Sequence, residues 1–381
     1  MTISIITVCY NRAKTIERTI KSVINQDYED TEYIVIDGGS IDGTVDIIRK
    51  YESDIAYWIS EKDDGIYAAM NKGICHATGE IIAFLNSDDW YEKDILSEIA
   101  KRFEEEEIQL LCGNIYHHSE NSVSKYCVSK EIEQELRYRM PYWQPAMFVS
   151  KKLFEEYGNF NTRYRIAADY DWLLRMYDRH IEITVMDKVF TNFSYGGIST
   201  QANFLKIQAE EGKMVALLAL DRNQELTEGQ KEKWRNEIEK EYIKGIENYK
   251  LKELLKDIAA GDQNEILTCI RHAFERNQYA VFGCGIIFRE LSAILKHLHI
   301  SIIALWDNNA EKWGKCIDGV EIGNPDDMKL GRDVVIVAST NYENEIGKLL
   351  EQKGFKKGTN YLLYSELRQS IVDLARKVIV D

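Results

Sequence analysis

The first hundred residues repeat one pattern: an apolar segment rich in β-branched residues, then a polar loop, then a stretch with helical spacing. The apolar segments lie at about residues 3–10, 31–37, 55–60 and 81–86, and the helical stretches at about 14–26, 40–51, 66–77 and 95–106. Short apolar strands that alternate with helices are typical of a parallel sheet with helical crossover connections. The sequence therefore predicts an α/β fold for this part of the chain.

The apolar segment at 81–86 runs directly into two acidic residues, Asp88 and Asp89. In an open α/β sheet, ligands bind outside the carboxyl ends of the strands. Adjacent carboxylates at that edge repel each other unless a cation or a donor network compensates, and Mg²⁺ or Mn²⁺ typically takes one or two carboxylates together with substrate phosphates. The pair therefore predicts a nucleotide site with a divalent cation, with a solvated turn as the alternative.

Length, charge and cysteine content limit the class of protein. A chain of 381 residues is too long for one ordinary core and indicates two or three domains. A net charge of −15 argues against nucleic acid as the main partner, because phosphate binding requires a basic surface. The chain has no stretch of about 20 apolar residues and begins with a strand, so we expect a cytoplasmic protein. The 7 cysteines lack metal-ligand spacing and indicate reduced thiols.

The pattern changes after residue 108. Residues 108–150 contain short strands that suit a mixed sheet, and 167–177 read as a helix. Charged and helix-forming residues dominate from 203 to 275, where we expect two to four linking helices with solvated charges. A second, smaller α/β domain follows. The predicted division is an N-terminal domain at 1–202, a helical linker at 203–275, a C-terminal α/β domain at 276–366 and a C-terminal helix at 367–381.

Four segments, in this order and spacing, resemble the motifs of family-2 glycosyltransferases with the GT-A fold. They are SIITVCYNR at 4–12, IVIDGGSIDGT at 34–44, EKDDGIYAAMNKGI at 61–74 and FLNSDD at 84–89, and the likeness extends through DYDWLLR at 169–175. The resemblance covers about half of the chain. It implies an inverting transfer of a hexosyl or N-acetylhexosaminyl group from a nucleotide sugar, with UDP as the expected nucleotide, to a hydroxyl of a glycan or lipid-linked saccharide in surface polysaccharide synthesis.

The resemblance also assigns roles to individual residues. It implies that Asp169 is the catalytic base, which takes the proton of the acceptor hydroxyl. It implies Asp89 as the metal ligand and Mn²⁺ or Mg²⁺ as the ion. The donor-binding residues that it implies are Thr7, Tyr10, Asn11, Asp37, Asp63, Asn71, Lys72 and Asp88. Each of these positions also has a structural alternative, such as a helix cap, a strand-to-helix turn or an exposed helical lysine.

Three positions depart from the family pattern. Asn86 stands where the first acid of the metal motif is frequent, and Ala68 and Ala168 stand where relatives often carry an acid. A contact that relatives make through the acid at position 68 is therefore absent or replaced in this chain. Candidates for the acceptor side are Trp143, Gln144 and Arg175, and the loop at 196–199 is a candidate for closing over the diphosphate.

In the C-terminal part, GCGIIFRE follows a strand and opens a helix, and Asp307 closes the next strand, as in a dinucleotide-binding half. Phe288 stands where the third glycine of that motif belongs. The strands and turns resemble small Rossmann-like domains, a likeness at the level of the fold. A structural, regulatory or assembly role is favoured over nucleotide binding at Gly283, Gly285 and Asp307, and NAD(P) is not expected.

Other functions remain open from the sequence. A sugar nucleotidyltransferase also needs a nucleotide fold and metal carboxylates, but no glycine-rich triphosphate loop follows the first strand. A non-catalytic nucleotide-sugar sensor and a dehydrogenase or epimerase centred on the C-terminal domain are further alternatives. The sequence also leaves open peripheral contact with the inner face of the membrane and the formation of a homo-oligomer.

Overall fold

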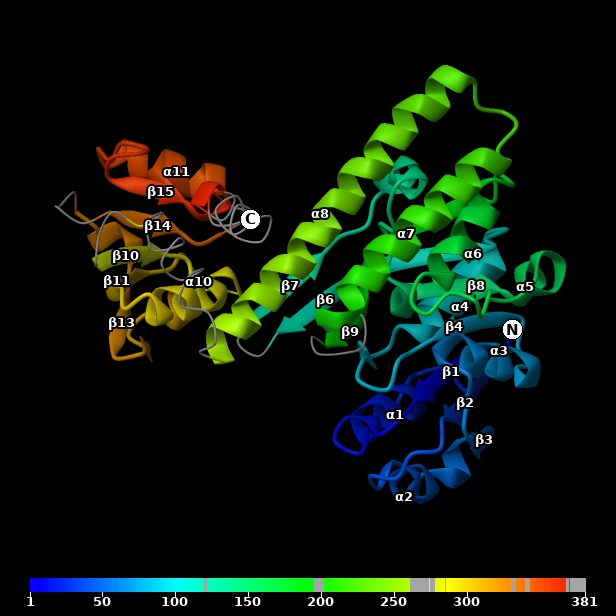
Figure 1. Cartoon of the computed structure of the whole chain (residues 1–381). Helices are drawn as coiled ribbons and strands as arrows, with labels where there is room; N and C mark the ends of the chain where they lie inside the picture. Colours follow the sequence, from blue (N-terminus) through cyan, green and yellow to red (C-terminus); the bar gives the residue numbers. More distant parts are fainter. Residues whose placement is uncertain are drawn as a thin grey trace. The chain divides into compact units, whose positions relative to one another are not determined.

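The computed structural model describes residues 1–119, 122–194, 202–260, 274, 278–284, 286–329, 334–339, 343–367 and 370. Contacts divide the chain into two compact units, Met1–Ile246 and Glu247–Asp381, each built on its own sheet (Figure 1). The predicted α/β class with a second, smaller domain is thereby confirmed. Within the described ranges, no helix is both long and apolar enough to cross a membrane.

Four parallel strands form the first half of the sheet in the first unit. They are β1 (Ile3–Cys9), β2 (Thr31–Asp37), β3 (Tyr57–Ser60) and β4 (Ile81–Phe84), in the order β3-β2-β1-β4. The helices between and after them are α1 (Ile16–Ile24), α2 (Thr44–Lys50), α3 (Ile66–His76) and α4 (Leu96–Glu105), with a 3₁₀ turn, η1, at Glu52–Asp54. Because the strands are parallel, the loops that follow them all leave the sheet at one edge.

The second half of the sheet mixes strand directions, as predicted for residues 108–150. It contains β5 (Trp90–Tyr91), β6 (Leu110–Ser119), β7 (Ser122–Tyr126), β8 (Met147–Ser150) and β9 (Ile183–Ser194). Strand β8 is antiparallel to both β4 and β6, and β9 is parallel to β6. Strands β6 and β9 therefore run in the direction of β4, and the end of β9 reaches the edge where the acidic loop lies. Two 3₁₀ segments, η2 (Lys130–Arg137) and η3 (Gln144–Ala146), precede β8.

Hydrophobic cores lie on both faces of this sheet. Residues Ile16, Ile20 and Val23 of α1 follow helical spacing and pack into one core, which α4 also covers. The other core is covered by α3, by α5 (Lys151–Tyr157), by α6 (Ala168–Tyr177) and by α7 (Ala202–Arg222), which α8 (Glu228–Ala260) follows. Helix α7 and Ile238 of α8 are thus part of the core of the first unit. The domain limits at 202 and 275 stay a prediction.

The second unit contains a six-stranded sheet in the order β12-β13-β11-β10-β14-β15. Its strands are β10 (Gln278–Phe282), β11 (Ser301–Trp306), β12 (Cys316–Ile317), β13 (Val320–Gly323), β14 (Val335–Val337) and β15 (Tyr361–Leu363), with helices α10 (Ile286–His297) and α11 (Glu343–Gln352) and 3₁₀ turns η5 (Ala310–Lys312) and η6 (Pro325–Asp327). Among the strands of this sheet that the structure describes, β12 alone pairs in the antiparallel sense. The predicted C-terminal helix at 367–381 lies almost entirely outside the described residues.

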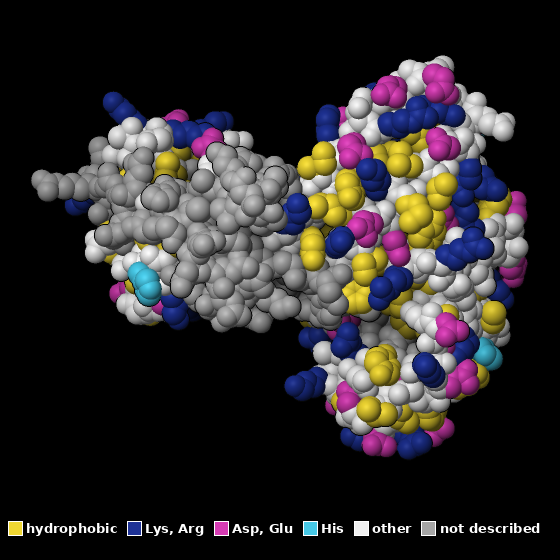
Figure 2. Space-filling view, in the orientation of Figure 1, with side chains coloured by type: hydrophobic (Ala, Val, Ile, Leu, Met, Phe, Trp, Pro, Cys, Tyr) yellow, Lys and Arg dark blue, Asp and Glu magenta, His cyan; other side chains and the backbone are white. Residues whose placement is uncertain are grey.

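Charges are mixed on the visible surface of the first unit. Figure 2 shows Lys and Arg interspersed with Asp and Glu on the described atoms of this face, and individual hydrophobic side chains between them. Such a surface lacks the basic stripe that a nucleic-acid partner requires, on the face that the view presents.

Candidate donor and catalytic site

The loops that follow β1 and β2 are tied to each other by hydrogen bonds. Asn11 has a left-handed backbone (φ 52°), its N–H donates to Ser40 Oγ at 2.7 Å, and its Oδ1 accepts the N–H of Ile41 at 3.0 Å. Its neighbour Tyr10 is 59% exposed. Asn11 therefore shapes the loop, while Tyr10 presents an open aromatic ring at the edge of the sheet. Of Tyr10 and Asn11, two of the predicted donor residues, Tyr10 has the larger exposed surface.

Asp37 is fully buried at the end of β2, with an exposed fraction of 0%. Its Oδ2 accepts the N–H of Gly39 at 3.1 Å, the N–H of Ser40 at 2.8 Å and the hydroxyl of Ser60 at 2.6 Å, and its Oδ1 accepts the Ser40 hydroxyl and the Cys9 thiol. These bonds occupy both oxygens and define the turn after the strand. A direct contact between Asp37 and a donor remains a prediction.

Thr7 lies in the interior of β1. It is buried, and its Oγ1 accepts a hydrogen bond from Tyr33 Oη at 3.1 Å. This placement favours a structural role over the predicted contact with a donor.

The acidic loop after β4 is held by the end of β9. Asp89 is 1% exposed, its Oδ1 accepts the N–H of Ser194 at 2.9 Å, and its Oδ2 accepts Asn86 Nδ2 at 3.3 Å. Burial, and then the neighbouring charge of Asp88, raises the pKa of Asp89, and burial also raises the pKa of Asp88. A cation bound at this loop would favour the ionised form of both carboxylates and would oppose both rises in pKa.

Arg18 of α1 fixes the same loop from outside. Its guanidinium lies 3.5 Å from the centroid of the Trp90 ring and donates to the backbone oxygen of Asp88 at 2.8 Å and to Ser194 Oγ at 3.0 Å. Burial lowers the pKa of Arg18. The sequence offers no signal for this role, because an arginine in an amphipathic helix is ordinarily a solvated residue.

The residues of the loop fit a divalent cation. Asn86 Oδ1 is buried without a hydrogen-bond partner among the described residues. The Asp88 carboxylate is bonded by its own amide, and the charges of Arg12 and Arg18 lower its pKa against the effect of burial. In the described part of the chain, no three His, Cys, Asp or Glu side chains converge as metal ligands. A site with few protein oxygens suits Mg²⁺ or Mn²⁺, since these ions keep waters and substrate phosphates as ligands.

Lys72 of α3 and Asp63 of the preceding loop are brought together. Lys72 Nζ lies 2.6 Å from Asp63 Oδ1 and 2.6 Å from Glu61 Oε1, and its bonds to Asp63 and then Glu61 raise the pKa of Lys72. The second oxygen of Asp63 is buried and has no partner in the described structure. Asp63 thus retains one acceptor oxygen without a partner in the described structure, and its contact with a donor stays a prediction.

Asn71 is used by the protein itself. Its Nδ2 donates to the backbone oxygen of Phe160 at 2.9 Å, and its Oδ1 accepts the N–H of Phe160 at 3.0 Å. The amide therefore clamps α3 to the loop between α5 and α6, and this placement favours a structural role over the predicted donor contact.

We expect Asn71→Ala to lower the free energy of unfolding by about 1–3 kcal/mol, because both backbone groups of Phe160 lose their partner. The donor affinity of the folded fraction should stay unchanged. Urea unfolding and calorimetry with the donor measure the two quantities. An unchanged stability with a large loss of donor affinity would instead support the predicted donor contact.

Asp169 lies in the first turn of α6 and is half-buried. Its Oδ1 accepts the phenol of Tyr67 at 2.9 Å and the N–H of Tyr170 at 2.8 Å. Burial raises the pKa of Asp169, and these two hydrogen bonds oppose the shift. Its Oδ2 has no hydrogen bond to another described residue. The carboxylate thus has one fixed oxygen and one available oxygen, an arrangement that suits a general base.

The start of α6 is capped by a residue far away in the sequence. Ala167 provides no side-chain cap. Instead Glu211 of α7, 9% exposed, accepts the backbone N–H groups of Arg165, Ile166 and Ala167 at 2.8 to 3.2 Å. The Ala167 amide belongs to the N-cap residue, and the other two amides belong to the turn that leads into the helix. An anion is favourable here, because the helix dipole is positive at this end. Glu211 is an exception to the predicted solvation of charges in 203–275.

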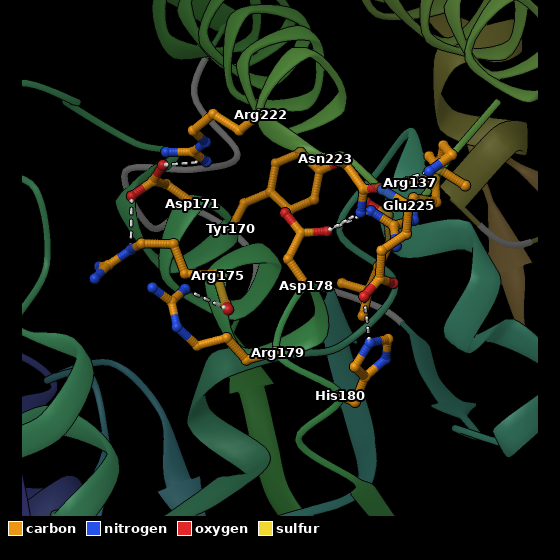
Figure 3. Close-up of polar contacts among 12 residues, drawn as sticks. Arg137, Tyr170, Asp171, Arg175, Asp178, Arg179, His180, Arg222, Asn223 and Glu225 are labelled. Atoms are coloured by element: carbon orange, nitrogen blue, oxygen red, sulfur yellow. Dashed lines mark hydrogen bonds and ion pairs between the residues drawn. The ribbon is translucent and has the colours of Figure 1, made fainter. Parts of the chain in front are cut away.

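Further ion pairs join α6 to the end of α7. The Asp171 carboxylate lies 3.3 Å from Arg175 Nε and 3.8 Å from Arg222, as Figure 3 shows. Arg175 also donates to the backbone oxygens of Tyr157 and Asn159 at 2.5 and 2.8 Å. Asp171 and Arg175 therefore hold the helix in place, and Arg175 has little freedom to bind an acceptor.

The other acceptor-side candidates lie at the edge of the sheet. Trp143 packs against Phe193, with ring centroids 5.1 Å apart, and against Tyr126 at 5.6 Å. Gln144 Nε2 lies 3.3 Å from the sulfur of Met70. Since β9 carries both Phe193 and Ser194, this aromatic group lies next to the acidic loop. The predicted loop at 196–199 lies outside the described residues.

In the second unit, the Asp307 carboxylate is already engaged. It accepts the N–H of Cys284 at 2.8 Å and the N–H of Asn309 at 2.8 Å, and it pairs with Lys312 Nζ at 2.9 Å. Gly283 has a left-handed backbone (φ 98°). The carboxylate thus accepts the Cys284 amide, which a bound phosphate would otherwise use. Gly285 lies outside the described residues.

Sequence comparison matches residues 4–179 to the model of glycosyl transferase family 2 and residues 275–358 to the model described as C2185-like, N-terminal. A PGL/p-HBAD biosynthesis glycosyltransferase of Mycobacterium bovis is 30% identical over 203 residues, which are 51% of this chain and 78% of that protein. This chain belongs to glycosyl transferase family 2. The cholesterol galactosyltransferase of Borreliella burgdorferi is 32% identical to this family-2 member over 116 residues, 30% of this chain and 32% of the relative.

Structural comparison supports the same fold. S. aureus TarS 1–349 in complex with UDP-GlcNAc superposes on this family-2 chain with a TM-score of 0.51 and 16% sequence identity, over 78% of this chain and 90% of the other. Against a longer TarS chain, the match covers 43% of that chain. At this identity the likeness shows the fold alone, and the predicted GT-A fold of the first unit is confirmed.

Proposed function

We propose that the first unit transfers a hexosyl or N-acetylhexosaminyl group from a nucleotide sugar to an acceptor hydroxyl in a single displacement with inversion. The observation that carries this proposal is the Asp169 carboxylate, with Oδ1 held by Tyr67 and by the Tyr170 amide, and with no hydrogen bond from Oδ2 to another described residue. Membership of glycosyl transferase family 2 supports it, and the TarS complex with UDP-GlcNAc supports a UDP-linked donor.

In this proposal Asp169 Oδ2 takes the proton of the acceptor hydroxyl while the acceptor oxygen attacks the anomeric carbon. The bond between that carbon and the diphosphate oxygen breaks, and the nucleoside diphosphate leaves with the bonding electron pair. A bound Mn²⁺ or Mg²⁺ would neutralise charge on the leaving diphosphate, and Asp88, Asp89 and Asn86 are the residues that would hold it. The exposed ring of Tyr10 suits contact with a donor, as does Asp63 Oδ2, which has no hydrogen-bond partner in the described structure. Lys72, paired with Asp63 and Glu61, supplies a positive charge beside them.

For the acceptor we propose a glycan or a lipid-linked saccharide in surface polysaccharide synthesis, reached from the cytoplasmic side of the membrane. The similarity to a cholesterol galactosyltransferase supports an acceptor with a lipid part. For the second unit we propose a Rossmann-like domain with a structural, regulatory or assembly role, because the carboxylate of Asp307 is taken up by Cys284, Asn309 and Lys312.

The test is a screen of donor binding with UDP, GDP, dTDP and CMP sugars, with Mn²⁺ or with EDTA. We expect one nucleotide class to raise the temperature of the unfolding midpoint, and only when the metal is present. At a donor concentration of 100 Kd, the free energy of unfolding should rise by about 2.7 kcal/mol. Asp88→Ala should remove this effect, since the Asp88 carboxylate has no side-chain hydrogen bond to another described residue and is a candidate metal ligand. Asp46→Ala, at an exposed position on α2, is the matched control.

Three results would contradict the proposal. If no nucleotide sugar stabilises the protein, the proposed donor site is wrong. Release of pyrophosphate from a nucleoside triphosphate would favour a nucleotidyltransferase. Tight donor binding without transfer to any acceptor, and unchanged by Asp169→Asn, would favour a sensor.

A further inference from the structure

Tyr67 is a buried phenol that meets the candidate base. It lies in the first turn of α3 and is 6% exposed. Its Oη donates to Asp169 Oδ1 at 2.9 Å, a contact between residues 102 positions apart. The motif that contains Tyr67 points to nucleotide binding through its acids and its lysine, and it gives no reason to expect contact with the acceptor side.

The orientation of Tyr67 is determined by its surroundings. Its ring packs against Phe160, with centroids 5.5 Å apart, and Phe160 in turn packs against Phe84, Phe154 and Trp172. One turn further along α3, Asn71 binds both backbone groups of Phe160. The helix and the loop are therefore clamped together at the position where the phenol projects toward α6.

We propose that Tyr67 is a positioning residue that holds Asp169 Oδ1 and thereby leaves Oδ2 as the oxygen that faces the acceptor hydroxyl. This inference rests on the proposed role of Asp169 as the base. The Tyr170 amide and the phenol both donate to the same oxygen, at 2.8 and 2.9 Å, so rotation of the carboxylate would break two hydrogen bonds. The geometry therefore selects one oxygen for the proton transfer.

The phenol also stabilises the ionised form of Asp169. Burial raises the pKa of Asp169, and the hydrogen bond from Tyr67 is the largest effect that opposes this rise. Other ionisable groups near the start of α6 are already paired: Asp171 on α6 with two arginines, and Glu211 on α7 with three backbone amides. Tyr67, on α3, is therefore the group whose removal should act directly on Asp169.

Tyr67→Phe tests the inference, because it keeps the ring that packs on Phe160 and removes the hydroxyl. We expect the pKa of Asp169 to rise by about one unit, since a hydrogen bond to a charged group corresponds to about one to two units. Carbon-13 NMR of the carboxyl group in the donor-free protein, with Asp169→Asn to assign the signal, measures this without any turnover. In transfer assays, the acid limb of kcat should move upward by the same amount, with the KM for the donor unchanged.

Tyr28→Phe is the matched control, because it removes the hydrogen bond from a phenol to Met1 O at the opposite edge of the sheet. It should move neither the Asp169 signal nor the acid limb. If Tyr67→Phe is folded and leaves both quantities where they are in the wild type, Tyr67 has only a packing role and the inference is wrong. If Asp169→Asn retains full transfer, the proposed base is wrong and this inference fails with it, so the two failures are distinguishable.

Discussion

Asp169→Asn is expected to lower the rate of sugar transfer by about 10²–10⁴-fold, the usual contribution of a general base. The amide has the shape of the carboxylate and can still accept the hydrogen bond from Tyr67, but it cannot take a proton. Donor affinity should not change, because the described contacts of Asp169 are with Tyr67 and Tyr170 and not with the acidic loop. Initial rates with a saturating donor, together with calorimetry of donor binding, measure both quantities.

The pH dependence of stability should change in the same variant. Burial raises the pKa of Asp169 in the folded protein, so the folded state binds the proton more tightly than the unfolded state does. The stabilising contribution of this group is fully present below its unfolded pKa and is lost as the pH rises through the folded pKa. At neutral pH the ionised carboxylate therefore costs stability, and Asp169→Asn should unfold at the same or a higher temperature than the wild type.

Asp46→Asn, at an exposed position on α2, controls for the loss of a carboxylate and should keep the wild-type rate. Thermal unfolding at several pH values, from about 4, near the ordinary pKa of an aspartate, up to about 8, tests how the stability depends on the protonation of Asp169. A wild-type transfer rate in Asp169→Asn would exclude this residue as the base. A lower rate with a lower unfolding temperature at neutral pH would contradict the sign of the pKa shift.

Glu211→Ala is expected to lower the free energy of unfolding by about 2–4 kcal/mol, because three backbone amides in the turn that leads into α6 lose a charged acceptor. The same change should reduce transfer, since α6 carries Asp169 in its first turn. The effect is large for a residue in a helix outside the matched family region, which ends at residue 179. Urea unfolding, followed by an assay under conditions where the variant is folded, separates the two consequences.

The neighbouring Glu210 provides the matched control. It lies on the same helix, is exposed, and is 3.8 Å from Lys206 in an i,i+4 pair of the kind that contributes little to stability. Glu210→Ala should therefore change the free energy of unfolding by less than about 0.5 kcal/mol. Equal effects of the two substitutions would show that helix propensity, and not the cap on α6, accounts for the loss.

The polarity pattern predicted the elements around the site because it depends on local chemistry. The apolar segment that runs into Asp88 and Asp89 predicts both a buried strand and the acidic loop after it. The segment around Asp169 predicts a helix with an acid in its first turn. These predictions can be made without knowing which strands pair with each other or in which register. The positions of both acidic groups were therefore predictable from the sequence.

The roles of several polar residues were not predictable in this way. Asn71 and Asp37 carry the residue types of a ligand site, but their hydrogen bonds go to Phe160 and to the turn after β2. A side chain that can bind a ligand can equally satisfy a buried backbone group, and the residue type is the same in both cases. Only the position of the neighbouring loop decides between the two.

The sequence by itself determined the α/β class, the loops that follow the strands, and the acids that those loops carry, because apolar periodicity and residue chemistry are local properties. Tertiary structure alone decided that Tyr67 meets Asp169 and that Glu211 caps the helix that carries it. These contacts join residues 102 and about 45 positions apart. Their energies come from satisfying buried donors and acceptors, and that requirement exists only once the helices and the sheet have packed together.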